Sequence, residues 1–333
     1  AELGAVYDSG ALSNRNKIIN GAFQVWQRGT SQTGTNSYSS VDRWVLYTSG
    51  NGLTASQSTD VPSNSGLHYS IATTGTPSGE YILAQGVELP ATGSAGEFYN
   101  GQKITISYYA KSSVAGDKLR HFIAFRDTVT GSSNQSLIEN NTDQNDLTTS
   151  YQRFSKTYTI SVDPNGTNTN LCVMIRTRNS ANDSSTAAGN ITIAGVQLEL
   201  GTEATPFEHR SFGQELALCE RYFQKYNYSS NTSSADTQNT LPLVAAYSGG
   251  TGYAGHKLTH TMRTSPTFSA SAANTWVFYA GGSSYTPSEM TAYETGPSMW
   301  GQKYVATSNF TTGHAVYGRA NSTSSYYQFD AEL

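Results

Sequence analysis

The sequence predicts a mainly β protein, built as a two-sheet antiparallel β-sandwich, a short linking helix and a smaller C-terminal β-domain. Short segments alternate between apolar and polar side chains, and Gly-, Ser-, Asn- and Thr-rich turns separate them, as in antiparallel sandwiches. Charged residues are only 13% of the 333-residue chain, about half the usual share, so neutral polar side chains must supply the solubility. The 22 Tyr, 12 Phe and 4 Trp offer enough apolar surface for packed cores.

Four parts are expected along the chain. A polar arm containing Gly and Ser covers residues 1–13, and the β-sandwich domain covers residues 14–210. The linking helix is expected over residues 211–228, and the C-terminal β-rich domain over residues 229–333. Within the last part, residues 228–240 form a Ser- and Asn-rich linker.

The strands of the first domain are expected to follow one another without an intervening helix. Its opening segment contains Asn20-Gly21, a strong turn signal. The clearest alternation places Ile104, Ile106 and Tyr108 on one face. Residues 171–177 are apolar on both faces, as in a central sandwich strand. The strand candidates are residues 41–47, 67–71, 81–89, 103–110, 119–125, 152–162, 171–177 and 191–200, the last with an irregularity at Gly195. The long connections 131–149 and 179–189 are either functional or only solvated.

The helix is predicted from its start signal and its apolar spacing. Ser211 and Gln214 fit a capping box. Apolar residues at spacings of three and four form one stripe: Phe212, Leu216, Cys219, Phe223 and Tyr226. We favour a core-facing stripe, with packing near an oligomer axis as the alternative. The strand candidates that follow are residues 241–247, 259–262, 267–271, 275–279, 302–307, 315–320 and 326–333.

Charge and cysteine content exclude several classes of function. The net charge is −4 and no basic stripe occurs, so we expect no nucleic-acid binding. No apolar run approaches the roughly 20 residues needed to cross a bilayer. The start of the sequence lacks the features of a signal peptide, so synthesis in a cytoplasm is expected. Cys172 and Cys219 are interpreted as small buried hydrophobic residues, with a disulfide as the alternative.

No catalytic motif is present, and we expect no catalytic residue. Carboxylate pairs are the groups that a glycan-cleaving enzyme would use. Asp143 and Asp146 are candidates in a loop, and Glu199, Glu203 and Glu208 cluster after a strand. We interpret the first pair as solvated loop residues and the second cluster as turn or cap residues.

We also expect no metal site and no cofactor. His256 and His260 would share a face of either a strand or a helix, so a weak metal site is the alternative to ordinary surface histidines. Asp127, Asp163 and Asp183 could hold a structural calcium ion, although nothing in their spacing is diagnostic.

Aromatic residues in the C-terminal domain are the feature most compatible with binding. Flat rings stack on sugar faces, and Tyr and Trp are favoured where one edge stays wet. The candidate ligand-binding residues are Trp276, Tyr279, Tyr285, Trp300, Tyr304 and Tyr317. Tyr293 belongs to the same concentration. Core packing is the alternative for all of them.

Two groups of segments resemble a known family. The first is NRNKIINGAFQVWQRGTS at residues 14–31 with DRW at 42–44. The second is AGVQLE at 194–199, ATPFE at 204–208 and ELALCERYF at 215–223. Both resemble tail-fibre-like and appendage proteins of tailed phages, especially those of marine bacteria, and residues 262–267 and 329–333 resemble that group's C-terminal part. The first domain is similar, more loosely, to jelly-roll carbohydrate-binding modules, which implies a jelly-roll-like sandwich.

The resemblance implies a virion structural protein that is homotrimeric, exposed on the particle and attached to other virion proteins through its N-terminal arm. It assigns no catalytic or ligand residue. The expected function is a tail-fibre or receptor-binding protein that recognises host cell-surface glycan by multivalent, non-catalytic binding. The alternatives are a capsid-decorating or other appendage protein without its own receptor, and a glycan hydrolase or esterase. The chain has neither the long β-helix of a tailspike depolymerase nor a fibrous repeat, which favours a compact tip, knob or decoration.

Overall fold

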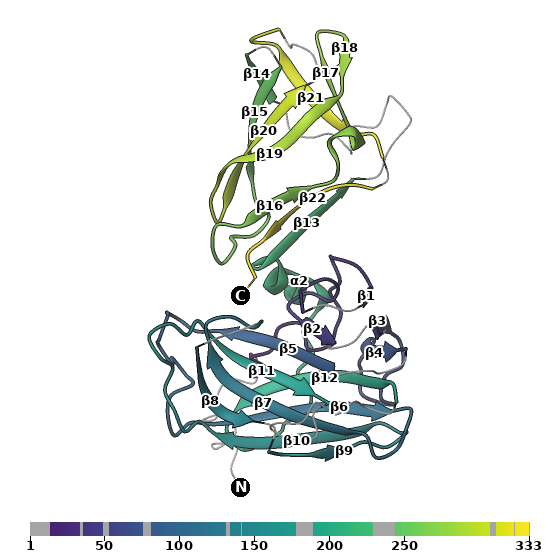
Figure 1. Cartoon of the computed structure of the whole chain (residues 1–333), viewed down its shortest axis with the longest axis vertical. Coiled ribbons are helices and arrows are strands. Elements are labelled where there is room, and N and C mark those ends of the chain that lie inside the picture. The colour runs from purple at the N-terminus through teal and green to yellow at the C-terminus, as the bar shows by residue number, and fades with distance from the viewer. Residues whose placement is uncertain are drawn as a thin grey trace. The chain divides into compact units, whose positions relative to one another are not determined.

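A computed structural model describes most of the chain. The described residues are 14–33, 36–48, 53–75, 81–130, 134–140, 142–177, 189–228, 244–248, 250–306, 311–322 and 324–332. The expected arm 1–13, most of the expected linker 228–240 and most of the expected loop 179–189 lie outside them. The chain divides into two compact units, Ala1–Leu216 with Leu333, and Ala217–Glu332. Each unit is mainly β, as predicted (Figure 1).

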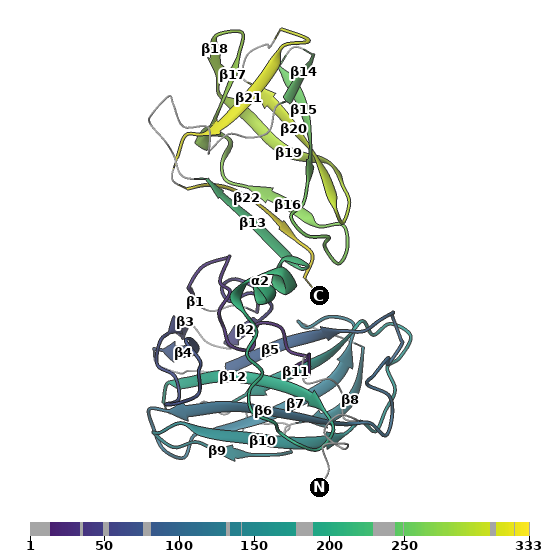
Figure 2. The same cartoon turned by 180° about the vertical axis from the view of Figure 1, so that it is seen from behind.

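The first unit is a jelly-roll-like sandwich of two antiparallel sheets. One sheet has the order β1 (Ser31–Thr33), β3 (Thr54–Ser58), β4 (Ser70–Thr74), β12 (Ile191–Leu200), β6 (Lys103–Ser112) and β10 (Gln152–Thr159). The other has the order β2 (Val45–Thr48), β5 (Tyr81–Glu88), β11 (Asn170–Arg176), β7 (Lys118–Arg126) and β8 (Gln135–Asn140), and β9 (Asn145–Asp146) also pairs with β7. Figure 1 shows β5, β11 and β7 side by side, and Figure 2 shows β12, β6 and β10.

Alternation along the strands builds the core between the sheets. Ile104, Ile106 and Tyr108 of β6 are all fully buried, as predicted. Every residue of β11 is buried, which confirms the prediction of a strand that is apolar on both faces. Its odd-numbered residues join the inner core, while Cys172 and Met174 join a separate apolar cluster on the opposite face. The β2-β5-β11-β7-β8 sheet therefore has an apolar outer face as well as an apolar inner one.

Several local expectations are confirmed and others need correction. Asn20 has a left-handed φ of 57° and accepts a turn hydrogen bond from the Phe23 N–H, so the predicted turn is present. Gly195 has a φ of 58° at a register shift in β12, which is the predicted irregularity. The expected loop 131–149 contains β8 and β9. Strands β1 and β3 were missed because their mostly polar sequences show no apolar alternation.

The linking helix α2 spans only Phe212–Glu220, which corrects the expected 211–228. Its capping box is confirmed, because the Gln214 N–H donates to Ser211 Oγ at 3.3 Å and the Ser211 N–H donates to Gln214 Oε1 at 3.0 Å. Residues after Glu220 form strand β13 (Phe223–Tyr228) instead. Within the expected core-facing stripe, Cys219 and Phe223 are buried as expected, whereas Phe212 is 55% exposed. No described helix is long and apolar enough to span a membrane.

The second unit contains two antiparallel sheets. The larger has the order β18 (Ser283–Tyr285), β17 (Trp276–Ala280), β21 (Ala315–Ala320), β14 (Val244–Ser248), β15 (Thr251–Lys257), β20 (Met299–Ala306) and β19 (Pro287–Thr295). The smaller has the order β13, β22 (Ser325–Asp330) and β16 (Thr267–Ala270), and a short 3₁₀ turn, η2 (Ala273–Thr275), precedes β17. Residues 259–262, expected as a strand, are irregular, and residues 326–330 lie in a sheet as expected.

Candidate functional site

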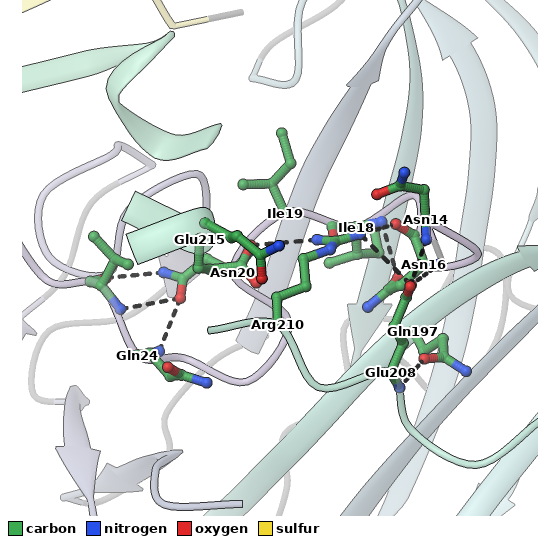
Figure 3. A network of polar contacts seen from close by, with 12 residues as sticks. Asn14, Asn16, Ile18, Ile19, Asn20, Gln24, Gln197, Glu208, Arg210 and Glu215 are labelled. Carbon is green, nitrogen blue, oxygen red and sulfur yellow. Dashed lines mark hydrogen bonds and ion pairs between the residues drawn. The ribbon is translucent and has the colours of Figure 1, made fainter. Parts of the chain in front are cut away.

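Residues from segments 14–24, 197–210 and the start of α2 meet in one polar network of the first unit (Figure 3). The Glu208 carboxylate accepts hydrogen bonds from the backbone N–H groups of Asn14, at 2.5 Å, and Asn16, at 2.7 Å. The Glu208 N–H in turn donates to Gln197 Oε1 at 2.8 Å. One carboxylate thus ties the start of the described chain to the turn after β12.

A second carboxylate of the network, that of Glu215, accepts a hydrogen bond from the turn at Asn20. Glu215 Oε1 accepts the Asn20 N–H at 2.5 Å and lies 3.3 Å from Arg210 Nη1. Arg210 Nη1 also donates to the Ile18 carbonyl oxygen at 3.0 Å. These hydrogen bonds join side chains to the backbone within the unit, so we interpret the residues of this network as structural.

Carboxylates of the predicted cluster accept hydrogen bonds from the backbone near turns, as expected. Glu199 accepts hydrogen bonds from the Thr205 N–H at 3.1 Å and the Thr205 hydroxyl at 2.5 Å. Glu203 is exposed, and Glu208 belongs to the network just described. Glu199 and Glu208 therefore stabilise separate backbone turns.

Asp143 lies in a buried network that the sequence reasoning missed. Its carboxylate accepts the Tyr158 hydroxyl at 2.7 Å and the His121 N–H at 2.9 Å, and it also contacts His121 Nδ1. His121 Nε2 faces the Tyr108 hydroxyl at 3.1 Å, and Asn145 Nδ2 donates to the same hydroxyl. Asp143 was expected to be a solvated loop residue. That expectation is wrong, because its carboxylate is hydrogen-bonded to His121 and Tyr158 of the sandwich strands.

Burial, hydrogen bonds and charge shift the pKa values of the groups in this network. Burial raises the pKa of Asp143, but the hydrogen bonds and charge of His121 outweigh it, so that the net pKa lies below the ordinary value. Burial, followed by the Asp143 charge, raises the pKa values of Tyr108 and Tyr158 far above their usual range. His121 and Tyr108 are fully buried, so the network acts as a cross-link between β6, β7 and β10. Asp146, by contrast, pairs with Lys118 on the surface at 2.6 Å.

The two histidines considered as an alternative metal site do not lie on one strand. His256 lies in β15, while His260 lies beyond the end of that strand and its Nδ1 contacts the Glu220 carboxylate. Cys172 and Cys219 are buried and are not joined in a disulfide, as expected. Burial raises the pKa of the Cys172 thiol to about 11.

Two of the three Asp residues considered as ligands of a structural calcium ion accept local backbone hydrogen bonds. Asp127 accepts the Thr128 N–H at 2.8 Å, and Asp163 accepts the Asn100 N–H at 3.2 Å. Asp183 lies outside the described residues. Within the described parts of the chain, no three His, Cys, Asp or Glu residues are grouped as metal ligands would be.

The predicted aromatic ligand residues divide between the two faces of the large sheet of the second unit. Trp276, Trp300 and Tyr304 are 1–3% exposed and belong to the core. Tyr285 packs against that core. Core packing, the alternative reading, therefore describes these four. Their density in the sequence could not reveal their face, because strand alternation assigns neighbouring rings to opposite sides.

The outer face of the same sheet carries tyrosines. Tyr279 and Tyr317 stack with centroids 5.1 Å apart and planes at 14°. Tyr253 contacts both Tyr247, at 5.6 Å, and Tyr293, at 4.7 Å between centroids. Tyr247 is 70% exposed and Tyr293 is 61% exposed. Of the predicted candidates, only Tyr279 and Tyr317 lie on this tyrosine face.

The first unit contains a groove of about 420 Å³ on the outer face of its β2-β5-β11-β7-β8 sheet. Its apolar lining residues are Val45, Ile82, Ala84, Phe122, Val129 and Met174. Tyr47, Arg126, Gln135 and Arg176 are among the polar ones. Its volume falls within the range of about 300–1,000 Å³ typical of small-ligand sites. This groove is a candidate site for a ligand.

The groove is centred on the Phe122 ring. The Arg126 guanidinium lies 5.7 Å from the ring centroid, and the Arg176 guanidinium lies 5.6 Å from it. Phe122 and Arg126 share the outer face of β7 because they are four residues apart on a strand. Opposite them, Met174 pairs with Phe122 across the β7–β11 ladder. The groove could not be detected from the sequence, because its residues come from five strands and their connections, whose spatial order was unknown.

Comparisons with known proteins give only weak likenesses. No protein-family model and no curated protein sequence matches the chain. The enzymatically active domain of tailspike protein 4 from bacteriophage CBA120 is 16% identical, with a TM-score of 0.36, over 56% of this chain and 22% of that one. A putative sugar binding protein from Bacteroides thetaiotaomicron is 10% identical, with a TM-score of 0.38, over 56% and 100% of the two chains. The CBM22-1 xylan-binding domain from Paenibacillus barcinonensis is 14% identical, with a TM-score of 0.31, over 52% and 94%. Scores this low identify no family, so the function must be argued from the chain's own geometry.

Proposed function

We propose that this chain is a non-catalytic glycan-binding protein that serves as the receptor-binding part of a phage tail fibre. The groove of the first unit carries the proposal. It combines an apolar floor at Phe122 and Met174 with hydrogen-bond donors at Arg126 and Arg176. Sugars present apolar ring faces and polar edges, and such a mixture is suited to bind both.

The virion role rests on the resemblance of the sequence motifs to phage appendage proteins. In the proposal the chain is a homotrimer, attached to other virion proteins through residues 1–13, made in the host cytoplasm and needing no cofactor. Three identical grooves would raise the apparent affinity by roughly 10² to 10⁴ over a single weak site. The tyrosine face of the second unit, with Tyr279 and Tyr317, is the alternative location for glycan binding.

Retention on immobilised bacterial surface polysaccharides, measured together with product release, tests the binding function. We expect the purified chain to be retained by at least one polysaccharide with no release of reducing ends or acetate. Release of either product would instead favour a glycan hydrolase or esterase. Failure to bind any polysaccharide or host cell contradicts the proposal.

The virion role needs a separate test on intact particles. Antibodies against the chain should label the tail and should block adsorption of phage to cells. Label on the head, without an effect on adsorption, would favour the capsid-decorating alternative. Such a result would concern only the position of the protein on the virion. The retention experiment would still test glycan binding by the groove.

A further inference from the structure

The charge of the groove in the first unit is opposite to that of the whole chain. The chain has a net charge of −4. The described residues that line the groove include Arg126 and Arg176 and no carboxylate. Arginine stays protonated in proteins. An anion entering this groove would therefore meet positive charge, although the molecule as a whole repels it.

Arg126 is the more informative of the two cations. It is 7% exposed. Its Nη1 donates to the Val129 carbonyl oxygen at 3.0 Å, and its guanidinium lies over the Phe122 ring. It also lies beside the Cys172 thiol, whose pKa burial raises and Arg126 lowers. These groups are uncharged, and Arg126 forms no ion pair with a described residue.

The buried position of Arg126 has an energetic consequence. A buried charge is normally paired, because removal of a charge from water is costly. The Arg126 Nε is buried and has no hydrogen-bond partner. The guanidinium thus retains a donor and an uncompensated charge beside an open groove. An anionic ligand group in the groove would supply the missing charge.

Arg176 places a second guanidinium beside the Phe122 ring. Arg126 lies on β7 and Arg176 at the end of β11, and their guanidinium groups both approach the Phe122 ring. A sugar ring over Phe122 would thus have a cation on either side. Guanidinium groups bind carboxylate and sulfate through paired, charge-assisted hydrogen bonds.

We infer that the groove selects an acidic polysaccharide, whose carboxylate or sulfate groups pair with Arg126 and Arg176 while a sugar ring lies over Phe122. The inference rests on the proposed glycan-binding function and adds the chemical class of the glycan. The shared requirement is a negative charge on a sugar.

Matched polysaccharides test this selectivity. One pair is alginate and alginate whose carboxyl groups have been reduced to alcohols, and the other is a sulfated galactan and its desulfated form. Titration should give at least roughly tenfold tighter binding to the acidic member of one pair. The pair that discriminates tells whether carboxylate or sulfate is preferred. Added salt should weaken this binding, because salt screens charge pairs.

Substitutions assign the selectivity to the groove. Arg126→Gln should abolish the preference for the acidic member, and Arg126→Lys should retain part of it. Arg319→Gln is the matched control, because the Arg319 guanidinium lies 5.0 Å from the Tyr279 ring in the second unit. It should leave the preference unchanged. Circular dichroism on each variant checks the fold, and the salt dependence of the unsubstituted protein tests the inference without any variant.

The possible results distinguish failure of this inference from failure of the proposed glycan-binding function. Equal, salt-insensitive binding of acidic and neutral members overturns the inference and leaves glycan binding intact. A preference that survives Arg126→Gln but is lost in Arg319→Gln also overturns it. Absence of binding to either pair and to a panel of other bacterial polysaccharides overturns the glycan-binding function and the inference with it.

Discussion

The guanidinium of Arg126 lies 5.7 Å from the centroid of the Phe122 ring. Both residues are buried at 7% exposure, yet both line an open groove. They share the outer face of β7, which most sandwich strands would leave polar. The apolar outer face of this sheet is therefore the structural basis of the proposed site.

Asn20 should be essential for the stability of the first unit. Its side chain accepts the N–H groups of Gln24 and Val25 and donates to the carbonyl oxygens of Val25 and Asp42. Loss of these bonds in Asn20→Gly should cost roughly 3 kcal/mol or more. Asn20→Ala should cost about 1 kcal/mol beyond that, because Asn20 has a φ of 57°. Urea denaturation measures both, and equal stability of the two variants would contradict the assignment of backbone strain.

Asp143 should make the stability of the first unit depend on pH. Its pKa is held below the ordinary value in the folded protein, so its contribution is present above about pH 4. That contribution is lost as the pH falls through the folded pKa. Asp143→Asn should therefore lower the free energy of unfolding at pH 7 by about 1–3 kcal/mol and flatten the acid limb of the profile. Asp146→Asn, at the surface pair with Lys118, is the control and should change little; an unaltered profile in Asp143→Asn would contradict the network.

Trp300 should behave as a core residue, in contrast to Tyr317. Trp300 is 3% exposed and packs against Phe268 and Phe329 with centroids 5.0 and 4.7 Å apart. Trp300→Ala should destabilise the second unit by about 3–5 kcal/mol. Tyr317 is 44% exposed, and Tyr317→Ala should cost no more than about 1 kcal/mol. Denaturation followed by circular dichroism compares them, and a small effect of Trp300→Ala would return Trp300 to the set of ligand candidates.

The proposed homotrimer predicts the mass of the purified chain in solution. Light scattering on a sizing column should give three times the mass of one chain, as a symmetric appendage requires. A monomer at all concentrations would contradict the trimer. It would favour a binding module, or a decoration that assembles only on the particle.

Local patterns predicted those elements that local sequence determines. Ile104, Ile106 and Tyr108 revealed β6 because strand alternation alone buries them. Ser211 and Gln214 marked the start of α2 because capping acts within one turn. The end of α2 was missed because Phe223 and Tyr226 fit both a helix and a strand. Their pairing with β22 decides the outcome, and that strand lies far along the sequence.

The candidate site could not be predicted from the sequence for the same reason. Phe122 and Arg126 become neighbours of Met174 and Arg176 only through the pairing of β7 with β11. The contact between His121 and Asp143 likewise depends on tertiary packing. Aromatic density drew attention to the second unit, while the groove of the first unit has a single Phe at its floor.

Calorimetric titration with a polysaccharide that the protein retains would test the central claim most directly. The comparison needs the unsubstituted protein, Phe122→Ala in the groove and Tyr293→Ala on the tyrosine face of the second unit. We expect Phe122→Ala to weaken binding by roughly tenfold or more and Tyr293→Ala to leave it unchanged. Unchanged binding in Phe122→Ala with a loss in Tyr293→Ala would contradict the account and place the glycan site on the second unit.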